Sequence, residues 1–173
     1  YSRARNLLAG ARQVVEEYDG IVPSDYDKLL KIKGIGKYTA AAITSIAFNN
    51  PVAVVDGNVA RVVSRLFAIK EPVNSPEGQR QVHAVAGDLL DTHNPGRHNQ
   101  AMMEFGALVC PPRSPKCNKC VVYQHCQARL MNIQKMLPAK KPKNPVRVRW
   151  FNYLVIRVQS EGKPQSVLIE KRQ

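Results

Sequence analysis

Four cysteines packed into seventeen residues constrain this chain more than any other feature of its sequence. They are Cys110, Cys117, Cys120 and Cys126, with gaps of six, two and five residues. Cysteines confined to one short segment suit a metal site in a reducing compartment better than a disulfide framework. Four thiolates could bind zinc or an iron–sulfur cluster, so the segment is expected to fold around one of these.

The charge of the chain points to a polyanionic partner. Its 173 residues include 26 Lys and Arg against 13 Asp and Glu, a formal net charge of +13. No apolar stretch approaches the ~18 residues that a membrane span needs, so a transmembrane protein is excluded. The opening lacks an initiator Met and an export signal, and the chain is expected to be a fragment of an intracellular protein.

The residues before the cysteines are expected to form five or six helices with short connections. Apolar residues recur every three or four positions, and Gly, Pro, Ser and Asp stand where helices end or begin. A capping box at Ser24 and Asp27 is expected to start the second helix. The predicted helices cover about 3–18, 24–33, 37–48, 57–69, 76–90 and 98–109. Such a series predicts an all-α core.

A glycine hairpin joins two of these helices at residues 33–37. Gly34 and Gly36 can take positive φ and carry no Cβ, so backbone N–H groups there can approach an anion, and Lys33 and Lys37 add positive charge. The plainer alternative is an ordinary turn between helices with solvated lysines. In a chain this basic, residues Lys33, Gly34, Ile35, Gly36 and Lys37 are candidate phosphate contacts.

Asp56 is the only carboxylate in the apolar stretch around residues 52–63. It is well suited to cap the helix that follows it. A carboxylate fixed at a helix start can also stabilise an oxocarbenium-like sugar cation. The two roles are compatible, and Asp56 is a candidate catalytic residue.

The composition changes after Met136. Residues 136–148 combine prolines with lysines and arginines, which predicts a basic linker. Two runs with β-branched and aromatic residues follow, separated by a turn-prone segment at 161–164. These runs predict two strands of a second domain that the end of the chain cuts off.

The hairpin, the aspartate and the cysteine spacing together resemble the helix-hairpin-helix DNA glycosylases, in the branches of endonuclease III and MutY. This resemblance implies an all-α glycosylase domain over 1–109 that lacks its N-terminal part, and an iron–sulfur loop and helix over 110–135. The basic linker (136–148) would then lead into the first strands of a truncated NUDIX-like recognition domain (149–173). The resemblance favours a [4Fe–4S] cluster on Cys110, Cys117, Cys120 and Cys126, and phosphate contacts by Arg113, Lys116 and Lys119.

Several segments resemble the MutY-type adenine glycosylases more than endonuclease III. They are the opening YSRARNL, the segment NQAMMEFGALVC and the linker into a β-containing domain. Endonuclease III carries a Schiff-base lysine where this chain has Tyr38. The resemblance implies a monofunctional base-excision repair enzyme that removes adenine mispaired with 8-oxoguanine or guanine from duplex DNA.

The resemblance also implies roles for individual residues. Asp56 would stabilise the cationic sugar, Asn58 would orient the nucleophile or the substrate, and Tyr38 would lie near the departing base. The general acid of the family falls upstream of Tyr1, so this chain alone is expected to be inactive. The protein is expected to act as a monomer, inside the cell with the DNA. The alternatives are a pyrimidine glycosylase/lyase like endonuclease III and a non-catalytic DNA-binding module that contains zinc.

Overall fold

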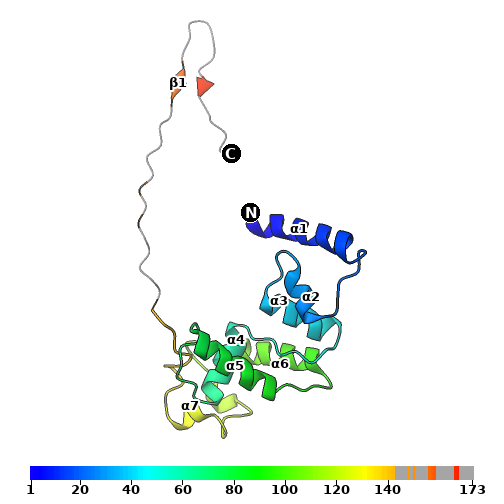
Figure 1. The fold of residues 1–173 in the computed structure, drawn as a ribbon. Coiled ribbons are helices and arrows are strands. Elements are labelled where there is room, and N and C mark those ends of the chain that lie inside the picture. Colours follow the sequence, from blue (N-terminus) through cyan, green and yellow to red (C-terminus); the bar gives the residue numbers. More distant parts are fainter. Residues whose placement is uncertain (143–147, 149, 151–155, 159–165, 168–173) are drawn as a thin grey trace. The chain divides into compact units, whose positions relative to one another are not determined.

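The computed structural model describes residues 1–142, 148, 150, 156–158 and 166–167. The chain divides into two units, Tyr1–Lys141 and Pro142–Gln173 (Figure 1). Every regular element of the first unit is helical. These elements are α1 (Ser2–Glu17), α2 (Tyr26–Lys31), α3 (Lys37–Ala42), the π-helical turn η1 (Ile43–Ala47), α4 (Gly57–Leu66), α5 (Pro76–Asp88), α6 (Pro95–Leu108), the 3-10 turn η2 (Cys117–Lys119) and α7 (Gln127–Leu130).

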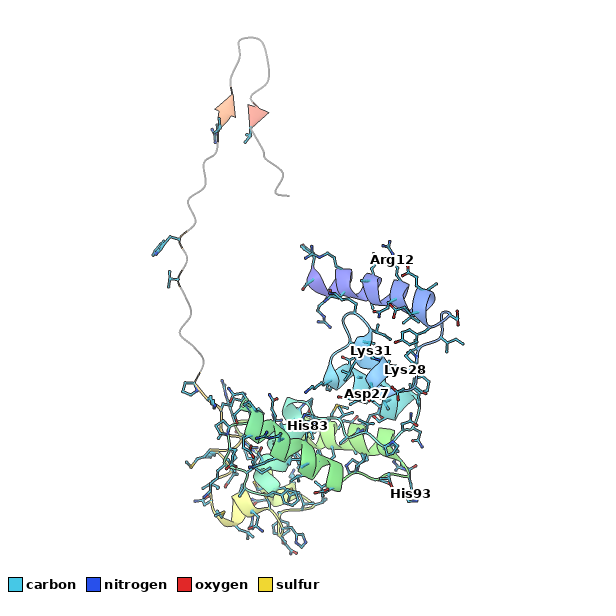
Figure 2. The ribbon with its side chains drawn as sticks, viewed as in Figure 1. Arg12, Asp27, Lys28, Lys31, His83 and His93 are labelled. Carbon is cyan, nitrogen blue, oxygen red and sulfur yellow. The ribbon has the colours of Figure 1, made fainter. Side chains whose placement is uncertain are left out.

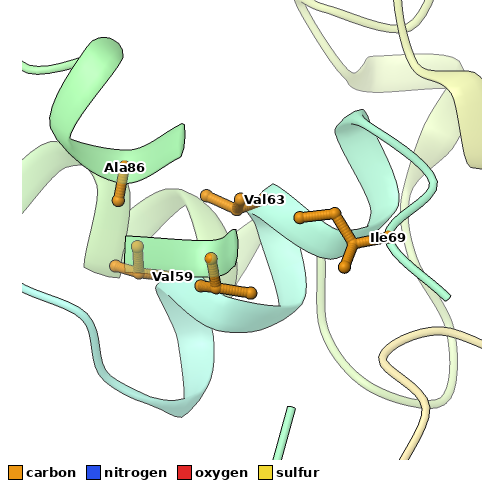
Figure 3. Packing of buried hydrophobic residues seen from close by; sticks show 5 residues of the cluster. Val59, Val63, Ile69 and Ala86 are labelled. Atoms are coloured by element: carbon orange, nitrogen blue, oxygen red, sulfur yellow. The ribbon is translucent and has the colours of Figure 1, made fainter. Parts of the chain in front are cut away.

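The larger core of the first unit forms around α4, which contacts α5, α6 and α7. Val59 and Val63 lie four residues apart and so share one face of α4. They form a buried cluster with Ile69, Val82 and Ala86 (Figure 3). The apolar face of α4 therefore fixes the helix whose N-terminus carries Asp56.

A second cluster holds the hairpin helices together. Leu29, Ile32 and Ala40 are buried, and Val14 of α1 and Tyr18 at the C-cap of α1 pack against them. The predicted apolar face of α1 is only partly covered, because three of its larger members stay exposed. These are Leu7, Leu8 and Val15.

Two predicted side-chain caps are present, whereas the starts of two other helices differ from the prediction. Asp56 caps α4 and Ser75 caps α5 through their side chains. The cap of α2 is Asp25, whose carboxylate accepts from the backbone N–H of Lys28 at 2.8 Å, so the predicted capping box at Ser24 and Asp27 is wrong. Helix α6 begins at Pro95, three residues before the predicted start. Proline suits this first position because its φ is preset and its missing N–H would have had no helical partner.

The segment after the cysteines returns to the helical unit. Arg65 Nε donates to the Leu137 carbonyl oxygen at 3.0 Å, and the Val73 N–H donates to the Ala139 carbonyl oxygen at 2.9 Å. We call residues 137–141 the strap. The start of the predicted linker is thus hydrogen-bonded to the first unit.

The second unit contains two short strands among its described residues. Strand β1 (Arg157–Val158) pairs antiparallel with β2 (Ser166–Val167), with Arg157 opposite Val167. The predicted turn at 161–164 and most of the predicted recognition domain lie outside the described residues.

Across the part of the chain that the structure describes, no helix has the length and apolar character needed to cross a membrane.

Candidate functional site

The carboxylate of Asp56 is held by three hydrogen bonds at the N-terminus of α4. Its Oδ1 accepts from the backbone N–H groups of Asn58 and Val59 at 2.8 and 2.7 Å, and its Oδ2 accepts from Asn58 Nδ2 at 2.8 Å. The first two bonds cap the helix, and the third fixes the plane of the carboxylate. The result is an oriented, partly buried acid.

Asp56 lines a cavity of about 710 Å³. Tyr38 and Lys37 of α3 line the same cavity, as do His83 of α5 and Lys140 of the strap. The structure therefore brings together Tyr38 and Asp56, which the sequence places eighteen residues apart. Asn58 does not line the cavity, since its side chain lies against the carboxylate of Asp56 and the guanidinium of Arg61.

His83 is the one imidazole that lines this cavity, and Figure 2 labels it on α5. Burial lowers the pKa of His83, and the ammonium group of Lys37 lowers it further. The imidazole is therefore mostly uncharged at neutral pH, when it can both donate and accept a hydrogen bond. Its position was not predicted, because nothing in the sequence near residue 83 forms a motif.

The side chain of Gln13 on α1 forms two hydrogen bonds to the backbone at the hairpin. Its Nε2 donates to the Lys31 carbonyl oxygen at 3.1 Å, and its Oε1 accepts from the Lys33 N–H at 2.9 Å. Helix α1 comes this close because residue 10 is glycine: a Cβ there would lie 2.5 Å from the Lys33 carbonyl oxygen. Gly10 and Gln13 are three residues apart on one helix face, which is the only hint of this role in the sequence.

The two hairpin glycines differ in conformation. Gly34 has a φ of +89°, as predicted, and a Cβ there would lie 3.0 Å from the Asn6 Cβ. Gly36 has a φ of −100°, so it does not use the positive φ that glycine allows. Gly36 instead takes the extended N-cap conformation at the start of α3, with open space where a Cβ would be.

The predicted phosphate contacts of the hairpin do not share one cavity. Lys33, Gly34 and Ile35 line a cavity beneath α1, whereas Lys37 lines the Asp56 cavity. All three predicted cations of the cysteine loop, Arg113, Lys116 and Lys119, are exposed and border a single shallow hollow.

The four cysteines line one small cavity, and none of them forms a disulfide. Burial raises the pKa of the Cys120 thiol, and the charges of the other three cysteines raise it further. Within the described residues, no three His, Cys, Asp or Glu side chains are grouped closely enough to hold one metal ion. The four cysteines thus share one common space.

Two buried arginines of α4 connect Asp56 to the cysteine loop. Arg61 Nη2 donates to Asn58 Oδ1 at 2.8 Å, and its Nε donates to the Cys110 carbonyl oxygen at 2.8 Å. Arg65 Nη1 donates to Cys110 Sγ at 3.2 Å. Only 7% of Arg61 and 2% of Arg65 is exposed. Burial lowers the pKa of Arg61, and the neighbouring Arg65 lowers it further, yet an arginine stays charged in proteins.

Comparisons with known proteins agree with this geometry. Residues 17–46 match the model of the helix-hairpin-helix motif. The human protein named adenine DNA glycosylase is 46% identical over 140 residues, which is 80% of this chain and 26% of the human protein. The protein of that name from Arabidopsis thaliana is 47% identical over 128 residues, 74% of this chain and 20% of the plant protein. That from Buchnera aphidicola of Baizongia pistaciae is 32% identical, and its match covers all of this chain and 48% of the relative.

Two solved structures resemble the fold. A thermostable thymine-DNA glycosylase has a TM-score of 0.68 and 34% identity, over 74% of this chain and 58% of that one. A non-covalent endonuclease III–DNA complex has a TM-score of 0.65 and 28% identity, over 78% and 61% of the two chains. The chain spans between about a fifth and a half of the length of the curated relatives that it matches.

The helical hairpin, the capping aspartate and these similarities define the class of the protein, which is that of the helix-hairpin-helix DNA glycosylases. Within this class, the chain is similar over most of its length to part of the MutY-type adenine DNA glycosylases, at 32–47% identity.

Proposed function

We propose that this chain is the part of an adenine DNA glycosylase that binds duplex DNA and carries the catalytic carboxylate. The reaction is hydrolysis of the N-glycosidic bond of adenine mispaired with 8-oxoguanine or guanine. The observation that carries the proposal is the Asp56 carboxylate, which is held by three hydrogen bonds beside a cavity that Tyr38 also lines.

Excision needs the base outside the helix, because the glycosidic bond of a stacked base is out of reach. The cavity of about 710 Å³ beside Asp56 is within the usual size range of ligand sites. As the bond to adenine breaks, positive charge develops on the sugar, and the oriented carboxylate of Asp56 stabilises it. Tyr38, 48% exposed on α3, then lies on the side of the departing base.

Asn58 acts through Asp56 in this proposal. Its amide nitrogen is engaged by the carboxylate and its amide oxygen by Arg61. With both ends of the amide occupied, Asn58 is a positioning residue rather than a direct contact of the nucleophile. No Glu among the described residues lines the cavity, so the proposal takes the general acid from sequence outside this chain.

The four cysteines fit a [4Fe–4S] cluster better than zinc. Zinc would draw four sulfur atoms to about 2.3 Å from one point, whereas the cluster binds each thiolate to a different iron. The gaps of six, two and five residues between the cysteines resemble those of the cluster loops of the family and favour the second arrangement, and all four cysteines line one cavity. When bound, the cluster supplies folding free energy to the loop. The hydrogen bond that Arg65 donates to Cys110 Sγ is typical of the interactions by which neighbouring residues orient the ligands of a metal.

Duplex DNA with an adenine mispair is the proposed partner. The net charge of +13 favours it, and the exposed cations of the hairpin and the cysteine loop offer contacts to phosphates. The protein would act as a monomer, wherever in the cell the DNA lies.

A second candidate is a lyase of the endonuclease III type. The observation that favours it is Lys37, whose side chain lines the Asp56 cavity one residue before Tyr38. An amine there could attack the sugar and form an imine. Adenine glycosylase relatives at 46–47% identity favour the hydrolytic reaction instead.

The test is base excision by the full-length protein on a panel of duplexes with A opposite 8-oxoguanine, G or T, and T opposite G. We expect adenine release from the first two duplexes and no covalent adduct with borohydride. Release of thymine, or an adduct that Lys37→Gln abolishes, would show the second candidate instead. An absorption band near ~400 nm in the purified protein would exclude zinc.

A further inference from the structure

We propose that Lys140 binds a phosphate of the DNA strand whose base is excised, and that the strap holds it there. The inference rests on the proposed function, because it requires a duplex at the Asp56 cavity. It is carried by the juxtaposition of the strap, anchored by Asn74, with the wall of that cavity.

The strap is fixed on both sides of Lys140. Asn74 Nδ2 donates to the Lys141 carbonyl oxygen at 3.2 Å, and Asn74 Oδ1 accepts from the Lys141 N–H at 2.7 Å. On the other side, the Ala139 carbonyl oxygen accepts from the Val73 N–H. An amide that pairs with both backbone groups of one residue imitates the pairing of two strands. The backbone at Lys140 is therefore set before any ligand arrives, which lowers the entropy lost on binding.

Lys140 stands where a phosphate of a flipped nucleotide would be. It is exposed, and it lines both the Asp56 cavity and an adjoining cavity of about 260 Å³. The two cavities also share Gly57, Ala60 and Val73 in their linings, so they adjoin at the start of α4. A nucleotide with its sugar at Asp56 brings its own phosphates to the rim of this space.

The charges around the cavity support a phosphate ligand. Lys37 and Lys140 come from α3 and the strap and line one space with a single carboxylate, that of Asp56. In the described part of the chain, neither lysine takes part in an ion pair. A lysine with no local partner on an anchored backbone is free to act as a point charge toward phosphate.

The test compares three single variants of the full-length protein, and the double variant of Lys140→Gln and Asn74→Ala. Lys140→Gln removes the proposed contact. Lys141→Gln is the matched control, because Lys141 contributes only backbone atoms to the anchor and lines neither cavity. Asn74→Ala breaks the anchor without changing the charge. The measurement is the Kd for a duplex with a tetrahydrofuran abasic site opposite 8-oxoguanine, over a range of KCl concentrations.

We expect Lys140→Gln to weaken binding about fivefold and to lower the salt slope by about one. Lys141→Gln should change the Kd less than about twofold. Asn74→Ala should weaken binding in the wild type and add nothing in the Lys140→Gln background, because the two changes remove the same contact.

An unchanged Kd and salt slope in Lys140→Gln would overturn the inference, and so would an equal loss in Lys141→Gln. These outcomes are separate from failure of the proposed function. If the wild type bound and excised normally while Lys140→Gln behaved like it, only this inference would be wrong. If the wild type bound no duplex, both would be wrong.

Discussion

Asn58 donates its side-chain amide to Oδ2 of Asp56 at 2.8 Å, so the two residues act as one unit. The amide oxygen of Asn58 accepts from Arg61, and Arg61 in turn donates to the carbonyl oxygen of Cys110. A continuous series of hydrogen bonds thus runs from the proposed catalytic carboxylate to the first cysteine of the loop.

Arg61 is expected to contribute strongly to stability. In Arg61→Met the buried carbonyl oxygen of Gly106 and the partly buried carbonyl oxygens of Gly57 and Cys110 lose a donor. The free energy of unfolding should fall by about 2–4 kcal/mol, measured by urea denaturation. The control is Arg12→Met on the exposed face of α1 (Figure 2), which should stay within about 0.5 kcal/mol of the wild type. Equal effects of the two changes would contradict the account of Arg61.

The hairpin prediction concerns charge at Gly36. Asp and Asn are both good N-caps, and the space at Gly36 is open, so Gly36→Asp and Gly36→Asn should both fold. Only Gly36→Asp places a negative charge where a phosphate would approach. Its affinity for every duplex should fall about tenfold relative to Gly36→Asn, whatever the mispair. A loss confined to mispaired duplexes, measured by fluorescence anisotropy, would mean that the hairpin contacts bases.

The cysteine loop should depend on the proposed iron–sulfur cluster. In Cys117→Ser we expect loss of iron, disorder over residues 110–126 and weaker duplex binding, because Arg113, Lys116 and Lys119 lose their fixed positions. Helix α4 should stay folded around its valine core. Iron content, circular dichroism and duplex affinity test this. A variant without iron that bound DNA as tightly as the wild type would contradict it.

The sequence predicts the parts of this site whose contacts join residues that are close together in the chain. Asp56 caps its own helix through residues two and three positions away, and the cysteines lie within one short segment. The helix cap at Asp56 and the grouping of the cysteines could therefore be inferred from spacing. Arg65 instead binds Leu137, 72 residues away, and Arg61 binds Cys110, 49 residues away. No local pattern indicates such partners, so both arginines were missed.

The same reasoning explains the errors at the helix boundaries and at the strap. Two candidate caps, Ser24 and Asp25, stand side by side, and only the folded backbone decides that Asp25 reaches the Lys28 N–H. Residues 137–141 have the composition of a linker, but Asn74 and Val73 bind their backbone. Composition alone cannot reveal such an anchor.

The pKa of His83 should respond to Lys37. Burial is the larger cause of its lowered pKa, and the charge of Lys37 is the second. Lys37→Gln should therefore raise the pKa of His83 but leave it below its ordinary value of 6.5, as measured by NMR titration of the imidazole. Because the folded state resists protonation of His83, its contribution to stability is present above about pH 6.5 and lost as the pH falls through the lowered pKa. No change in Lys37→Gln would mean that Lys37 lies away from the imidazole.

The central claim is that the carboxylate of Asp56 carries the chemistry. The most direct measurement is single-turnover excision of adenine opposite 8-oxoguanine by the full-length Asp56→Asn variant, with duplex affinity measured alongside. The asparagine oxygen can still cap α4, so the fold and DNA binding should be kept. The account predicts excision slower by about 10³-fold or more, because the charge that stabilises the sugar cation is gone. Excision within about tenfold of the wild-type rate would contradict it, since a missing transition-state charge costs more than that.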